Sequence, residues 1–138
     1  MREGVGRLVA GVNAAGAALT LAFWGFAALR LPPPWRVAAG ARLEAATTFA
    51  FGIADLVWAV PLLVLSARGL WRRTALGWTL AQAANVLWLY SLSVIGLRDA
   101  MAGSLSPGTA VFLPFALFAA WAAVALWRVR AAYWRGVR

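Results

Sequence analysis

Four long runs of apolar residues divide the chain, and shorter polar segments separate them. Each run has about the 20 residues that a helix needs to cross a bilayer. The pattern predicts helices at residues 5–29, 43–65, 74–97 and 109–129. The short link at residues 66–73 makes the second and third helices an antiparallel pair. We therefore expect an all-α protein, an integral membrane antiparallel four-helix bundle, with residues 1–138 forming a single transmembrane domain.

The composition fits a chain that is solvated mainly by lipid. Hydrophobic residues make up 64% and charged residues 12% of the sequence, whereas soluble domains average about 45–50% and about 25%. A net charge of +9 would also suit a nucleic-acid-binding protein. All 13 basic residues are arginines, however, and they lie mostly in the segments that flank the apolar runs. Membrane proteins place positive charge in this way, so we expect lipid and no nucleic acid as a partner.

The arginines also predict the orientation of the chain. With four spans, both termini and the link between the second and third helices lie on one side of the membrane. That side carries Arg2, Arg7, Arg68, Arg72, Arg73, Arg128, Arg130, Arg135 and Arg138. The other side carries only Arg30, Arg36, Arg42 and Arg98. Because cytoplasmic segments hold the excess of arginine, we expect both termini in the cytoplasm of a bacterial-type inner (plasma) membrane.

Alanine recurs at every fourth position in two of the predicted helices. These alanines are Ala10, Ala14 and Ala18 in the first helix, and Ala46, Ala50 and Ala54 in the second. Small residues at this spacing allow helices to approach closely in lipid. The pattern therefore predicts a packing seam along each helix.

Three further positions predict local structure. Pro61 removes a backbone donor inside the second apolar run, which favours a kink below Asp55. Gly69 suits the position just after a helix end, where a left-handed conformation is common. Ser106 followed by Pro107 is typical of a helix N-cap and first helical residue.

Asp55 is the feature of the sequence most in need of explanation. It lies within the second apolar run, where insertion scales assign an aspartate a cost of roughly 2.5–3.5 kcal/mol. One interhelical hydrogen bond contributes only about 0.6 kcal/mol on average. The carboxyl group must therefore be protonated, or it must meet water, a cation or an arginine. Ionisable groups at such depth commonly serve function.

Three amides are the candidate companions of Asp55. Asn13 and Gln82 each lie roughly 12 Å from the cytoplasmic end of their helices, at about 1.5 Å per residue. Asp55 comes to a similar depth if the apolar core is about 30 Å thick, and Asn85 lies one turn beyond Gln82. The sequence thus predicts a ligand-binding site of Asp55, Gln82, Asn85 and Asn13. A structural alternative is that the same groups only fix helix register through hydrogen bonds.

Glu44 and Trp58 extend this candidate site. Glu44 precedes Asp55 by almost three helical turns, so Glu44, Thr48 and Asp55 could form a polar track from the outer surface. Alternatively, Glu44 pairs with a neighbouring arginine at the level of the headgroups. Trp58 could line a pocket for a cation or a flat ligand, although tryptophans in membrane helices are more often anchors or packing residues.

Missing residue types exclude much chemistry. The sequence has no cysteine, histidine or lysine, which removes thiolate and imidazole ligands and Schiff-base chemistry. Roughly 16 Å of helix separates Glu44 from Asp55, too far for a carboxylate pair to share acid–base catalysis. We therefore expect no enzyme, no catalytic residue, no cofactor and no metal site.

Two functions remain open. In the first, the site around Asp55 binds a proton, a cation or a small ligand for transport or sensing, in a homo-oligomer. In the second, the chain is a non-catalytic accessory or assembly subunit of a larger membrane complex. The wholly apolar fourth helix and the alanine seams favour the second function.

Overall fold

A computed structural model describes residues 2–134, and within them the chain forms helices and no strand. Four helical segments in this part are long and apolar enough to cross a membrane. They are Gly4–Arg36, Ala39–Trp71, Ala75–Ala102 and Gly108–Arg128. The predicted all-α class and the four candidate spans are confirmed, and they indicate a multi-pass membrane protein.

The helices are longer than the apolar runs alone predicted. The first is α1 (Arg2–Arg30), and two short 3₁₀ turns, η1 (Pro34–Arg36) and η2 (Ala39–Ala41), follow it. The next three elements, α2 (Arg42–Ala54), the π-helical segment η3 (Asp55–Ala59) and α3 (Val60–Trp71), are continuous and form one rod. The chain ends with α4 (Ala75–Ala102), α5 (Pro107–Arg128) and the short α6 (Ala131–Trp134). The second rod therefore runs beyond residue 65 to Trp71, and α4 runs beyond residue 97.

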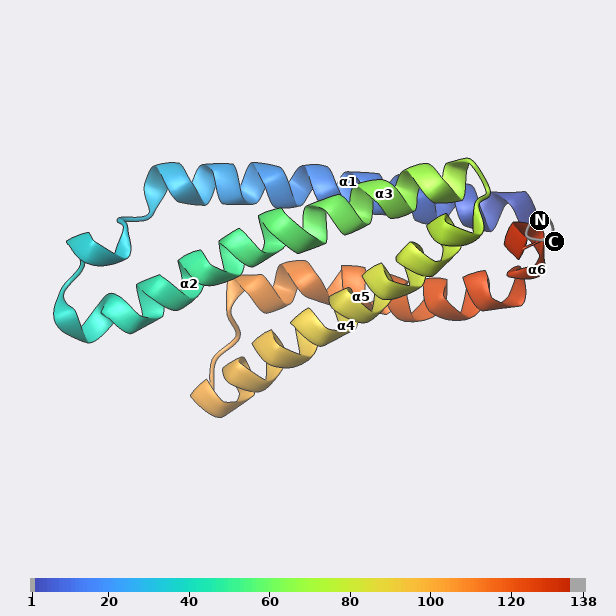
Figure 1. Cartoon of the computed structure of the whole chain (residues 1–138). Helices are drawn as coiled ribbons and strands as arrows, with labels where there is room; N and C mark the ends of the chain where they lie inside the picture. Colours follow the sequence, from blue (N-terminus) through green and yellow to red (C-terminus); the bar gives the residue numbers. More distant parts are fainter. Residues whose placement is uncertain (1, 135–138) are drawn as a thin grey trace.

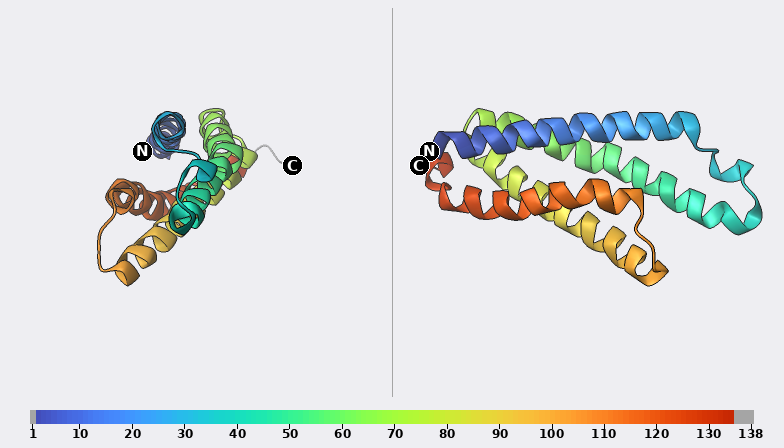
Figure 2. Two further views of the ribbon diagram at one scale, coloured as in Figure 1. Left: turned by 90° about the vertical axis from the view of Figure 1, so that its left-hand side faces the viewer. Right: turned by 180° about the vertical axis from the view of Figure 1, so that it is seen from behind.

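Packing follows the order of the chain: α1 contacts α3, α3 contacts α4, and α4 contacts α5. Figure 1 shows the start of α1 and the short α6 at the same end of the molecule. At the opposite end the helices spread apart, as both views in Figure 2 show. The buried apolar clusters lie in the joined part of the molecule, around Val9, Leu70 and Leu126 and around Leu63. In α2 only Gly52 is buried.

The predicted alanine seams are wrong in detail. Ala10 is buried, but Ala14 and Ala18 are exposed, and so are Ala50 and Ala54 of α2. Four residues turn an α-helix by slightly more than one full turn, since a turn holds about 3.6 residues. A strict four-residue stripe therefore rotates away from the neighbouring helix. The buried positions of α1 lie three or four residues on either side of Asn13, at Val9, Ala10, Gly16 and Ala17.

The link between α3 and α4 differs from its prediction. Gly69 is not at a helix end but lies inside α3, and Arg73 is the residue with a left-handed backbone (φ 55°). Gly69 faces Gly77 of α4 so closely that a Cβ built on Gly69 would lie 2.3 Å from the Gly77 Cα. Glycine is needed here because the two helix backbones touch.

The link between α4 and α5 is held by Asp99, in the last turn of α4. Its carboxylate is 4% exposed and accepts hydrogen bonds from the Ser106 backbone N–H and the Thr109 hydroxyl, both at 2.6 Å. Arg98 forms an ion pair with the other oxygen at 2.9 Å. The Ser106 hydroxyl accepts from the Thr109 N–H, which confirms Ser106 as the N-cap of α5. One carboxylate thus joins the end of α4 to the start of α5.

Candidate functional site

Asp55 begins the one stretch of the second rod that departs from α-helical winding. In η3 the Val60 N–H donates to the Asp55 carbonyl oxygen, an i to i+5 bond of the π type. Pro61 follows directly and has no N–H to continue an α-helical ladder. In place of the kink that Pro61 was expected to favour below Asp55, the structure has a π segment within one continuous rod (Figure 1). Single π turns of this kind are frequent at functional sites.

The Asp55 carboxylate accepts a hydrogen bond from the indole of Trp24 in α1. The Trp24 Nε1 lies 2.8 Å from the Asp55 Oδ2. The Trp24 ring packs against Gly52, one turn before Asp55, where an added Cβ would lie 2.6 Å from the ring. Gly52 therefore provides the space in which Trp24 reaches the carboxylate. The sequence pattern did not predict this partner, although an indole N–H is a hydrogen-bond donor that a carboxylate in an apolar environment needs.

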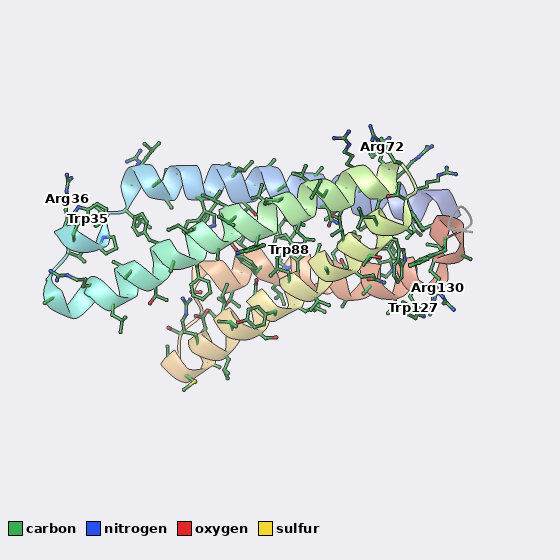
Figure 3. All side chains as sticks on the ribbon, viewed as in Figure 1. Trp35, Arg36, Arg72, Trp88, Trp127 and Arg130 are labelled. Atoms are coloured by element: carbon green, nitrogen blue, oxygen red, sulfur yellow. The ribbon has the colours of Figure 1, made fainter. Side chains whose placement is uncertain are left out.

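A cavity of about 20 Å³ borders Asp55. That volume is enough for about one water molecule, which needs some 10–15 Å³ measured in this way. Side chains from four helical segments line the cavity: Thr20, Asp55, Ala59, Leu63, Leu87, Trp88, Ser91 and Phe112. Asp55, Thr20 and Ser91 supply its polar groups. Trp88, labelled in Figure 3, closes one wall and stacks on Phe115, with 4.8 Å between the ring centroids.

The three predicted amides form two other interhelical links. Asn13 of α1 donates to the Ser66 hydroxyl of α3 at 2.8 Å. Gln82 of α4 donates to the Ala123 carbonyl oxygen of α5 at 3.0 Å, and Asn85 donates to the Gln82 side chain at 3.1 Å. The structure therefore brings Gln82 and Asn85 together, but it places Asn13 with Ser66 and Asp55 with Trp24.

The separation of Asp55 from the amides has a simple cause. The depth of Asp55 was estimated from the outer start of its helix, near residue 43, across an apolar core about 30 Å thick, whereas the rod continues to Trp71. Roughly 24 Å of helix, at about 1.5 Å per residue, lies between Asp55 and Trp71. Gln82 is only about 10 Å from the start of α4 on the same scale. Asp55 thus lies deeper in the protein, at the level of Trp24.

Glu44 and Trp58 lie outside this cavity. Glu44 is exposed in the first turn of α2, where its carbonyl oxygen accepts from the Thr48 hydroxyl. Trp58 is 73% exposed and points away from the other helices. The π segment turns the chain less per residue than an α-helix does, so Trp58 does not lie on the same face of the rod as Asp55. Trp88 is the tryptophan that lines the cavity.

The contact between Gly52 and Trp24 yields a first prediction. Gly52→Ala should destabilise the protein by about 1–3 kcal/mol, because the new methyl group overlaps the Trp24 ring. In a Trp24→Ala background the same substitution should be nearly neutral. A double-mutant cycle on the unfolding free energy in detergent measures this coupling. Gly25→Ala is the control, since open space surrounds a Cβ at Gly25. If Gly52→Ala cost the same in both backgrounds, the Trp24 ring would not pack against Gly52.

The site was also compared with known proteins. No family model, no curated protein and no solved structure matches this chain.

Proposed function

We propose that this protein binds a proton at Asp55 inside the bilayer and serves proton-linked transport. In this proposal the chain is an antiparallel four-helix bundle with both termini in the cytoplasm of a bacterial-type inner membrane. The supporting observation is a partly buried carboxylate that has a Trp24 donor on one oxygen and borders a cavity of the size of one water molecule. Carboxylates at such depth often belong to proton relays.

The volume of the cavity favours a proton over a larger ligand. Binding sites for small organic molecules usually enclose about 300–1,000 Å³, far more than the 20 Å³ beside Asp55. Within residues 2–134 no ion pair is recorded for Asp55. Protonation is then the simplest way to remove its charge, since an ionised carboxylate is costly in an apolar environment. A water molecule between Asp55, Thr20 and Ser91 would carry the proton to and from the carboxylate.

Proton flux into liposomes that contain the purified protein tests this proposal. The wild type should acidify liposomes loaded with a pH-sensitive dye at least about tenfold faster than Asp55→Asn, which cannot be protonated at this position. Asp55→Glu should retain part of the flux. A flux that Asp55→Asn leaves unchanged would refute the assignment of Asp55.

The cavity hydroxyl offers a matched pair of variants for the same assay. Ser91→Ala removes a polar group from the cavity and should slow the flux several-fold. Ser93→Ala, on the same helix, removes an exposed hydroxyl that donates to the Leu89 carbonyl oxygen, and it should match the wild type. Equal rates for the two variants would exclude Ser91 from the proton path.

A second candidate function is that of a non-catalytic accessory or assembly subunit of a larger membrane complex. The observation that favours it is the outward position of Ala50 and Ala54 on α2, beside the exposed Ile53 and Val57. Small residues on a lipid-facing surface can receive a neighbouring helix. The mass of the purified complex in mild detergent shows whether the chain assembles with other chains. A monomer with no co-purifying chain would argue against this function.

A further inference from the structure

A larger cavity, of about 280 Å³, lies between α1 and α3 near the end of the molecule that holds α6. It is lined by Ala10, Ala14, Ala67, Arg68, Trp71 and Arg72. Three of the six lining residues are alanines, whose side chains end at Cβ, so the two helices leave a groove between them here. The groove ends at the last residues of the candidate span Ala39–Trp71, close to one surface of the membrane.

Two guanidinium groups border the polar end of this groove. Arg68 and Arg72 are four residues apart in the last turn of α3 and just beyond it, so they share one helical face. Both side chains are exposed, and Figure 3 shows Arg72 projecting away from the packed helices. Among the residues that the structure describes, neither guanidinium donates to a protein acceptor. The pair is therefore available for an anion.

The opposite end of the groove is apolar. Val64, one turn before Arg68 on the same face, is 47% exposed, and Ala18 lies exposed one turn beyond Ala14. Trp71, which is 65% exposed, lies beside the two arginines at the end of α3. Tryptophan is typical of the headgroup level of a membrane. An occupant of this groove must combine an anionic group with a hydrocarbon segment.

We infer that this groove binds one anionic phospholipid. Arg68 and Arg72 hold its phosphate through charge-assisted hydrogen bonds, which guanidinium groups form in pairs with phosphate oxygens. Trp71 packs against the glycerol region, and the first methylenes of one acyl chain lie over Ala14 and Ala67. The volume is close to the lower limit of ligand sites, about 300 Å³, which suits a headgroup and the start of a chain. Basic pockets between membrane helices commonly hold such lipids.

Native mass spectrometry of the purified protein, titrated with phosphatidylglycerol, tests this inference. The wild type should retain one lipid with an affinity on the order of tenfold above that of Arg68→Gln/Arg72→Gln. Arg36→Gln/Arg42→Gln removes the same charge from exposed positions at the other end of the molecule and should bind as the wild type does. Equal losses in the two double variants would show attraction by net charge alone and would overturn the site.

A second pair of variants tests the groove without changing charge. Ala14→Leu fills the groove from an exposed position and should weaken lipid binding at least several-fold, whereas Ala28→Leu, also exposed on α1 but far from the lining, should not. Equal binding in these two variants would contradict the proposed position of the acyl chain. Inorganic phosphate, added alone at millimolar concentration, should not displace the lipid. Displacement by phosphate would mean that the site takes the free anion and not the lipid.

Discussion

Gly77→Ala is expected to destabilise the protein by about 2–4 kcal/mol, one of the two largest effects predicted for this protein. A Cβ on Gly77 would lie 2.1 Å from the Gly69 carbonyl carbon and 2.3 Å from its Cα. Both are backbone atoms of α3, so no side-chain rotation can relieve the overlap. The helices α3 and α4 would have to separate, and the buried cluster around Leu70 and Trp78 would open with them.

Gly96→Ala is the matched control for this substitution. Gly96 lies in the same helix, α4, and open space surrounds a Cβ at this position. Alanine favours a helix over glycine by about 0.5–1 kcal/mol, so Gly96→Ala should be neutral or stabilising. Equilibrium unfolding in mixed detergent, followed by circular dichroism, measures both variants. If Gly77→Ala were as stable as Gly96→Ala, α3 and α4 would not touch at Gly69.

Asp99→Ala is expected to cost about 3 kcal/mol, because it leaves several donors without their acceptor. The Asp99 carboxylate accepts from the Ser106 N–H, the Thr109 hydroxyl and the Arg98 guanidinium. Hydrogen bonds to a charged group contribute about 1.5–3 kcal/mol each, and such contributions are not additive. The loss should loosen the link between α4 and α5 more than the rest of the protein.

Arg98→Gln removes the ion pair with Asp99 and leaves the hydrogen bonds that Asp99 accepts from Ser106 and Thr109. Arg98 is 64% exposed while Asp99 is buried, and exposed ion pairs contribute about 0–1 kcal/mol. This variant should therefore lose less than about 1 kcal/mol. The melting temperature in detergent and the rate of proteolysis within residues 103–106 are the measurements. Equal costs for Arg98→Gln and Asp99→Ala would mean that the ion pair, and not the bonds to Ser106 and Thr109, holds the link.

Sequence patterns were sufficient for the large elements. Apolar length alone predicted four membrane-crossing helices, since the bilayer core sets that length physically. The N-cap at Ser106 followed from local backbone chemistry, which needs no knowledge of neighbouring helices. Pro61 marked a departure from regular winding, although the structure has a π segment there and not the predicted kink. These features depend on residues that are close together in the sequence.

Contacts between helices were predicted less well. Gly69 was taken for the end of α3, because a glycine that permits close approach to another helix has the same local signature as one that ends a helix. Ala14 and Ala18 were expected in a seam, but the side of α1 that faces α3 depends on the relative rotation of both helices. Such rotation is set by packing, for which a single sequence carries no direct signal.

The contacts of the candidate site were also predicted only in part. Asp55 was singled out for its cost in lipid, and the structure does give its carboxylate a donor. The donor is Trp24, however, and not Asn13, because Asn13 bonds to Ser66, which follows Asp55 by about three helical turns. The rod continues to Trp71, so Asp55 lies farther from that end of the molecule than predicted.

The central claim is that Asp55 exchanges a proton with water inside the membrane. Infrared difference spectroscopy in lipid, with carbon-13-labelled aspartate, tests it most directly, because the sequence contains only two aspartates, Asp55 and Asp99. For the wild type we expect a labelled carboxylic C=O band that appears on acidification and shifts in deuterated water. The band should change frequency in Trp24→Phe and be absent in Asp55→Asn. A spectrum in which Asp55→Asn removes no such band would contradict it.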